Sequence, residues 1–336
     1  MRPLLAVVAI AGVAGASGRV VRVEQPPRRE VFVPAGTFWM GVPEDDIDML
    51  YQRCTEYFEP HEIAQFLSPA TGQATSFCEM YRDELLAMPV HQVYLSAFAI
   101  DRDEVTVADY RACVSSGACA LDPLISGDER YIHDEWPLVN VTWQEADEFC
   151  HWRGGALPTE AEWERAARGN ADGPWPWCSE GEKACVERQG DFNHGQARSQ
   201  AMRDVDRTSG GQIPIQLMGD PDDVDGAVLL AKPGSYAWSQ GPYGTRDQAG
   251  NVAEWTADAR GKDDATFGYR GLGTEGRPLI NPRRDGTGTD ARVVRGGSWR
   301  QPSFIARDNV RDPFGMLYLP DRRFSHVGFR CARSTR

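Results

Sequence analysis

Eight cysteines in a chain of 336 residues restrict the folds open to it more than any other feature. An even number of cysteines is typical of chains that fold in an oxidising compartment, where thiols pair. Two pairs are separated by short polar segments and a third pair brackets a longer one. The spacing predicts three disulfides: Cys113–Cys119, Cys178–Cys185 and Cys54–Cys78.

Metal ligation is the other chemistry that cysteines offer. Zinc sites use closely spaced Cys or His residues, but this chain has no CxxC and its 6 His are scattered. Phosphate-binding, serine-hydrolase and zinc-protease motifs (GxxxxGK[ST], GxSxG and HExxH) are also absent from the sequence. The net charge of −13, without a basic block, argues against nucleic acid and anionic membranes as partners.

The N-terminus has the layout of a secretory signal peptide. Arg2 precedes an apolar run, residues 4–13, and the small residues 14–16 that follow fit a cleavage site. The run is too short to span a bilayer. We therefore expect a signal peptide over residues 1–16, a linker over 17–30, and export to the periplasm or the extracellular space. A buried N-terminal segment of a cytosolic protein is the alternative, because one Arg is a short basic region.

Helix start signals are confined to the first half of the chain. Three threonines precede the predicted helices: Thr106, Thr142 and Thr159. Glu145 and Glu162 stand three residues after the second and third, which predicts capping boxes, and Gly169 ends the third helix. Strand patterns occupy residues 31–42, 89–100, 291–295 and 326–330. The pattern predicts an α+β, loop-rich domain over residues 31–334.

Three segments look like insertions in this domain: residues 44–88, 195–232 and 257–290. The first is acidic and favours helix before it becomes rich in turns, and Cys54 and Cys78 lie within it. We expect it to form a flap pinned by that disulfide. The other two are long and polar, and loops of that length are usually functional or tied by metal.

Several motifs follow one another in a fixed order. They are residues 33–41 (VPAGTFWMG), 103–106 (DEVT), 137–143 (PLVNVTW), 156–164 (ALPTEAEWE), 250–255 (GNVAEW), 296–299 (GGSW) and 328–331 (GFRC). In this combination the chain resembles the formylglycine-generating enzyme (sulfatase-modifying factor) family. The resemblance implies a variant of the C-type lectin fold, with a few helices around small sheets and loops held by calcium. It also implies a disulfide between Cys150 and Cys331.

Residues 247–254 place two carboxylates around a glycine turn, and calcium prefers carboxylate and carbonyl oxygens. The resemblance implies calcium ligands here: the side chains of Asp247 and Glu254 and the carbonyls of Gly250 and Val252. The alternative is that the two carboxylates only cap turns.

The resemblance also implies a second calcium site, across an interval that is expanded in this chain. Its ligands are the side chains of Asn193 and Asp225 and the carbonyls of His194 and Ala227. Three other acidic residues compete with Asp225: Asp220, Asp222 and Asp223.

Active members of the family carry two cysteines just after the GGS turn, which hold copper(I) and engage the substrate. The corresponding positions here are Gln301 and Ala306. An amide and a methyl group cannot replace the soft sulfur ligands that select copper(I). We therefore expect no copper and no formylglycine-generating activity.

The segment after Gly297 is rich in aromatic and Arg side chains, which dominate binding surfaces. We expect a ligand-binding groove for a peptide, a protein or a small molecule, formed by Ser298, Trp299, Gln301, Ala306, Arg307 and Arg311. The alternative for single residues is that Trp299 and Phe304 are core and that the Arg are solvated.

The alternative function is a diverged oxidoreductase for a peptide or secondary metabolite, using Glu254, Ser298 or Arg307. A perturbed carboxylate in the groove would favour it.

Overall fold

The computed structural model describes residues 27–58, 66–67, 74–125, 129–182, 185–195, 225–227, 229–261, 269, 276–315 and 318–335. The predicted signal peptide and most of the predicted linker lie outside the described residues. So do residues 196–224, which make up most of the second predicted insertion, and parts of the other two. Among the described residues, no helix is long and apolar enough to cross a membrane.

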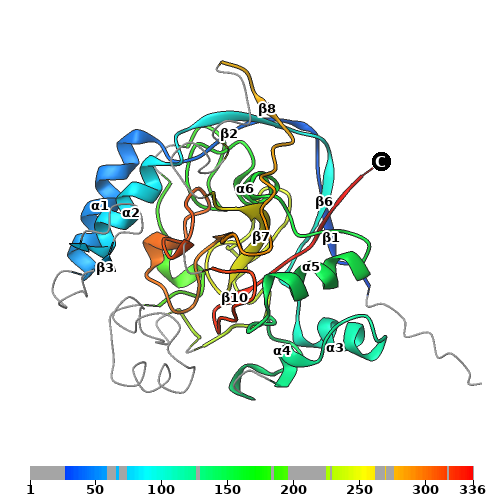
Figure 1. The fold of residues 1–336 in the computed structure, drawn as a ribbon. Coiled ribbons are helices and arrows are strands. Elements are labelled where there is room, and N and C mark those ends of the chain that lie inside the picture. Colours follow the sequence, from blue (N-terminus) through cyan, green and yellow to red (C-terminus); the bar gives the residue numbers. More distant parts are fainter. Residues whose placement is uncertain are drawn as a thin grey trace, which may run out of the picture.

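Regular elements occupy a modest part of the described chain (Figure 1). The helices are α1 (Glu44–Phe58), α2 (Phe77–Leu86), α3 (Val107–Ser115), α4 (Asp122–Ile125), α5 (Trp143–Trp152) and α6 (Glu160–Arg168). The strands are β1 (Glu30–Val33), β2 (Gly36–Met40), β3 (Phe66–Leu67), β4 (Ala74–Thr75), β5 (His91–Leu95), β6 (Phe98–Asp101), β7 (Ala253–Ala259), β8 (Leu279–Ile280), β9 (Arg292–Arg295), β10 (Val327–Gly328) and β11 (Ala332–Ser334).

The described strands form small sheets, of which three have three strands, in the orders β1-β6-β11, β10-β7-β9 and β2-β5-β8. β1 and β2 follow each other directly and pair antiparallel with β6 and β5, so the two N-terminal sheets share one long ribbon. The central strand β7 is buried along its whole length, and sequence reasoning did not predict it as a strand. The predicted mixture of helices and short strands is confirmed.

The predicted helix starts are confirmed. Thr142 and Glu145 form a capping box at α5, and Thr159 and Glu162 form one at α6. Each box satisfies backbone N–H groups that the first turn of a helix leaves without partners. Gly169 ends α6 with a positive φ of 61°.

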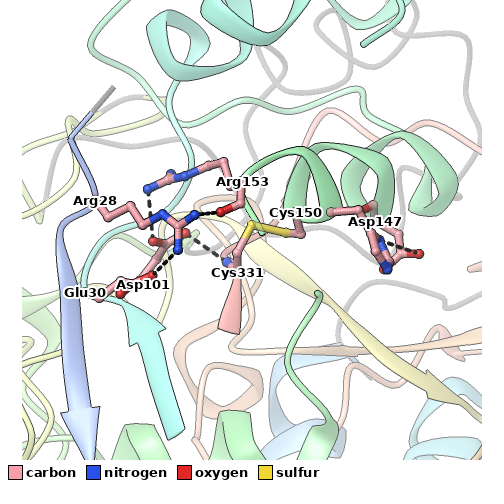
Figure 2. The surroundings of a disulfide bond; sticks show 8 residues. Arg28, Glu30, Asp101, Asp147, Cys150, Arg153 and Cys331 are labelled. Atoms are coloured by element: carbon pink, nitrogen blue, oxygen red, sulfur yellow. Dashed lines mark hydrogen bonds and ion pairs between the residues drawn. A yellow bond between two sulfur atoms is a disulfide. The ribbon is translucent and has the colours of Figure 1, made fainter. Parts of the chain in front are cut away.

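All four predicted disulfides are present in the structure. Cys150–Cys331 joins residues 181 positions apart and ties α5 to the strand pair β6 and β11. Figure 2 shows Asp101 beside this bond, where its carboxylate accepts a hydrogen bond from the Cys331 backbone N–H at 3.0 Å and pairs with Arg153. Burial raises the pKa of Asp101 to about 6. Arg28 donates to the carbonyl of Arg153, so the N-terminal segment is also fixed here.

The first predicted insertion forms a helical hairpin, α1–α2, which Cys54–Cys78 joins. Figure 1 shows the two helices side by side, against the segment that runs through residues 301–314. The apolar face of the hairpin is fully buried and includes Leu50, Phe58 and Phe77. The hairpin is therefore pinned by the predicted disulfide, and its apolar face is part of the main hydrophobic core.

Candidate functional site

Gln301 stands where active family members carry the first of their two cysteines, and it lies in the interior of the protein. Gln301 is fully buried, and its amide oxygen accepts a hydrogen bond from the Ser298 hydroxyl at 2.9 Å. Its amide nitrogen donates to a carboxylate oxygen of Asp312. Both ends of the Gln301 side chain are thus held by hydrogen bonds, and the amide links two segments of the loop. Burial raises the pKa of Asp312 to about 6.

Ala306 stands at the position of the second cysteine, and it is also fully buried. Ala306 packs in a cluster with Trp175 and Phe192, beside the Cys178–Cys185 disulfide. The backbone of Gly297 runs so close to Ala306 that a Cβ on Gly297 would lie 2.7 Å from its Cα. Gly297 also has a positive φ of 63°, so the GGS turn requires glycine at this position.

None of the six predicted groove residues is exposed. Ser298, Trp299, Gln301, Ala306, Arg307 and Arg311 are at most 4% accessible. A ligand would reach these side chains only if the structure around them moved. The predicted ligand-binding groove therefore stays a prediction, and the structure places these six side chains in the interior.

The α1–α2 hairpin covers this segment. Tyr57, Phe58 and Tyr81 contact the ring of Phe304, and Phe77 stacks on Phe314 with ring centroids 5.1 Å apart. Aromatic pairs in such arrangements contribute about 0.5–1.5 kcal/mol each beyond their area. The sequence could not show this, because the contacts join residues more than 200 positions apart.

Ion pairs also involve the α1–α2 hairpin. Arg307 pairs with Asp46 in the first turn of α1, and Arg53 pairs with Glu187 at 2.6 Å. Burial lowers the pKa of Arg307, and the Asp46 carboxylate opposes this effect. The hairpin is therefore bound to the 301–314 segment by both apolar and charged contacts.

The residues named for a diverged enzyme are committed to structural contacts. Glu254 accepts hydrogen bonds from the guanidinium of Arg330 on both carboxylate oxygens, and from the Trp163 indole at 2.8 Å. Glu254 and Arg330 are both fully buried. Ser298 donates to Gln301, as described, and Arg307 pairs with Asp46. Each of the three groups is buried and has a protein partner.

A buried carboxylate that the sequence analysis did not assign to calcium, Glu104, lies beside the first predicted calcium element, where it accepts a hydrogen bond from Asn251. Asp247 Oδ1 and Glu104 Oε2 are both buried and without a hydrogen-bond partner. Burial, and next the carboxylate of Asp247, raise the pKa of Glu104 well above its ordinary value. Two neighbouring buried carboxylates with vacant oxygens fit a hard cation, which would supply the missing charge. Glu104 belongs to the DEVT motif, which was the available signal.

Other parts of this element are less suited to calcium. Both carboxylate oxygens of Glu254 serve the Arg330 ion pair, so its predicted calcium contact competes with that pair. No group of three or more His, Cys, Asp and Glu side chains in the described part of the chain is arranged to hold a metal. A calcium site here would need backbone carbonyls, and those of Gly250 and Val252 are the predicted ones.

The structure brings the second predicted element together. Asp225 accepts hydrogen bonds from the backbone N–H groups of His194, at 2.7 Å, and of Ala227, at 3.0 Å. Asn193 Oδ1 is buried without a partner, and the Asn193 amide donates to the side-chain oxygen of Asn251 in the first element. The two elements are therefore adjacent. The competing residues Asp220, Asp222 and Asp223 lie outside the described residues.

A pocket of about 560 Å³ lies beside the second element. Asp191, Asp225 and Tyr236 contribute its polar groups, and Leu230 and Ala231 its apolar wall. This volume falls in the range of small-molecule sites. A second cavity of about 280 Å³ opens at the DEVT motif and is lined mainly by charged residues, Glu104 among them.

Comparison with protein families identifies the family to which this chain belongs. A family model described as "Sulfatase-modifying factor enzyme 1-like domain" matches residues 17–335. Formylglycine-generating enzyme of Streptomyces coelicolor is 31% identical over 294 residues, which cover 73% of this chain and 80% of that protein.

Two further relatives match over part of their length. Formylglycine-generating enzyme of Thermomonospora curvata is 33% identical over 206 residues, covering 58% of this chain and 55% of that protein. Inactive C-alpha-formylglycine-generating enzyme 2 of Bos taurus is 30% identical over 204 residues, covering 59% and 50%. The chain thus spans about half the length of the first curated relatives it matches. Among solved structures, PvdO from Pseudomonas aeruginosa superposes with a TM-score of 0.55 at 21% identity, over 91% of this chain and 94% of PvdO, and so shares the fold.

Proposed function

Because the chain belongs to the family of the sulfatase-modifying factor enzyme 1-like domain, we propose that it is an accessory module that keeps the family scaffold without the formylglycine-generating reaction. The observation that carries this proposal is the state of the two thiol positions. Gln301 and Ala306 are both fully buried. The inactive relative from Bos taurus supports the view that members of this family persist without the activity.

Features of the thiol positions, of the other cysteines and of the α1–α2 hairpin argue against oxidase activity in this chain. The side chains at the thiol positions cannot bind copper(I), because neither carries sulfur. All eight cysteines are paired, so no described cysteine offers a substitute thiol. The α1–α2 hairpin also packs on Phe304 and Phe314 of the 301–314 segment.

The test is an activity assay that separates the effect of the missing thiols from the effect of the hairpin. The purified protein is incubated with copper, O₂ and a Cys-x-Pro-x-Arg peptide, beside the variant Gln301→Cys/Ala306→Cys and an active bacterial relative. We expect aldehyde only from the relative. Aldehyde formed by the wild-type protein above a no-protein control contradicts the proposal. Aldehyde formed by the double variant alone would show that the hairpin does not exclude the peptide.

We further propose that the module is exported and holds calcium. Four disulfides fit an oxidising compartment.

The buried oxygens of Asp247 and Glu104 that lack hydrogen-bond partners support a cation between them, with Gly250 and Val252 as further donors. When bound, calcium would neutralise these carboxylates and fix the loops that carry them. Metal analysis by mass spectrometry, on protein purified without chelator, tests this. Stoichiometric calcium supports the proposal, and copper or iron at that level contradicts it.

A small ligand is best placed in the 560 Å³ pocket, since the six groove residues are buried. A thermal-shift screen of small molecules tests this with a variant that fills the pocket, Ala237→Trp, and a control at an exposed position outside the pocket lining, Ala118→Trp. Hits that stabilise the wild type and the control but not the filled variant support the pocket. Hits that act equally on all three place the ligand elsewhere.

One observation favours the second candidate, a diverged enzyme. Asp312 next to Gln301 is a carboxylate whose pKa burial raises to about 6, which suits proton transfer near neutral pH. Against this, Asp312 is 2% exposed and accepts hydrogen bonds from Gln301 and from the Phe314 N–H. Turnover of any peptide or metabolite that is lost in Asp312→Asn would favour the enzyme.

A further inference from the structure

Three large side chains lie next to one another on the outer face of the sheet β2-β5-β8. Trp39, Tyr94 and Ile280 are 55%, 37% and 73% exposed. The strand register pairs Tyr94 with Ile280 and pairs Trp39 with Gln92, so Trp39 is the diagonal neighbour of Tyr94. Diagonal neighbours in an antiparallel pair are about 7–8 Å apart. The three side chains therefore form one stripe across all three strands.

Packing in the hydrophobic core does not explain why these three positions carry large side chains. Successive side chains of a strand point to opposite faces, and the inner face is already complete. Phe38, Met40, Val93 and Leu95 are buried there and pack against Ala161 and Ala166 of α6. In Figure 1 this sheet lies at the top of the molecule, with α6 beneath it. The three outward side chains are thus not members of this core cluster.

We propose that this outer face, formed by Thr37, Trp39, Gln92, Tyr94 and Ile280, binds a neutral carbohydrate chain. A pyranose ring has an apolar C–H face that stacks on an aromatic ring and a rim of hydroxyl groups. Trp39 and Tyr94 offer two rings for stacking, at diagonal positions of the neighbouring strands β2 and β5. The Thr37 hydroxyl and the Gln92 amide stand beside them for the ligand's hydroxyls.

The charge and the size of the face argue against other occupants. None of the five residues that form the face has a charged side chain, so the face itself offers no counter-charge to an ionic ligand. The three large side chains expose on the order of 350 Å², whereas a stable protein interface needs about 800 Å² per partner. The surface is thus too small for a stable dimer but matches a ligand of a few rings. It also lies outside both cavities and both calcium elements, and so it is independent of the proposed function.

The test uses the purified full chain and three neutral probes: cellohexaose, chitohexaose and maltohexaose. Affinity is measured by calorimetry for the wild type, for Trp39→Ala, and for the matched control Trp238→Ala, which removes a Trp that is 64% exposed elsewhere. We expect at least one probe to bind the wild type and the control. We expect binding to Trp39→Ala to be at least tenfold weaker, with an unchanged melting temperature because Trp39 is half exposed.

Three results would overturn the proposal. The first is that no probe binds the wild type. The second is equal binding by wild type and Trp39→Ala. The third is a wild-type dimer in light scattering that Trp39→Ala makes monomeric, since this would assign the face to a second copy of the chain. Tyr94→Ala gives an independent check, because it removes the second ring and should weaken binding in the same way.

Discussion

The guanidinium of Arg307 is paired with the carboxylate of Asp46, across 261 positions of sequence. Arg307 directly follows the second thiol position, and Asp46 lies in the first turn of the inserted α1–α2 hairpin. Only 4% of the Arg307 side chain is accessible, so the ion pair is largely shielded from water. This contact joins the α1–α2 hairpin to the segment in which Gln301 and Ala306 stand at the family's two thiol positions.

Asp46→Asn should loosen the hairpin. The change removes a charge partner from a buried guanidinium, and we expect a loss of about 1–3 kcal/mol in the free energy of unfolding. Asp48→Asn is the matched control, because Asp48 is on the same helix with a side chain 89% accessible. We expect its effect to stay within about 0.5 kcal/mol. Urea denaturation measures both, and equal midpoints for the two variants would contradict this role of Asp46.

The four disulfides should differ in their effect on stability. In the chain-entropy model, a cross-link that closes a longer loop restricts the unfolded chain more strongly. For Cys150→Ala/Cys331→Ala, with a sequence separation of 181, we expect a loss of roughly 5 kcal/mol. For Cys113→Ala/Cys119→Ala, with a separation of 6, we expect roughly 2 kcal/mol. Thermal and urea unfolding of both variants test this order, and a larger loss for the short loop would refute it.

Asp312 should make the stability depend on pH. Its pKa is about 6 in the folded protein and near 3.9 in an unfolded chain. Between these values the folded state holds a proton that the unfolded state has lost. The free energy of unfolding therefore falls as pH rises from about 4 to 6, by roughly 3 kcal/mol from this group.

Asp312→Asn removes this titration, so the difference between its stability curve and that of the wild type should be confined to that window. Asp321→Asn, at an exposed position, is the control and should leave the profile unchanged. Parallel curves for Asp312→Asn and wild type would show that the carboxyl titrates normally.

Glu104 should contribute to calcium binding. If a cation lies between Glu104 and Asp247, Glu104→Gln keeps the hydrogen bond from Asn251 but removes a charged ligand. We expect calcium affinity to fall at least tenfold, and the rise in melting temperature with calcium to shrink accordingly. Calorimetry on chelator-treated protein measures the affinity. Glu135→Gln is the control, because Glu135 lines the adjacent cavity but has a side chain 72% accessible. Equal affinity in Glu104→Gln and wild type would remove Glu104 from the site.

The sequence by itself determined the local features of this protein. A capping box is a set of hydrogen bonds between residues three apart, so Thr142 with Glu145 could be identified without the fold. Short loops bring cysteines together in the same local way, as for Cys113 and Cys119. The ordered motifs gave the family, and through it Cys150–Cys331. The absence of thiols at positions 301 and 306 is likewise a property of the sequence.

Only the tertiary structure decided what surrounds these positions. Ala306 is buried by Trp175 and Phe192 from a distant segment. Phe304, between the two thiol positions, is covered by Tyr57 and Tyr81 of the hairpin. Glu254 could be assigned to calcium by its motif, but Arg330, 76 residues later, takes up both of its carboxylate oxygens. Burial and charge pairing of this kind arise from contacts between distant segments, and no local spacing encodes them.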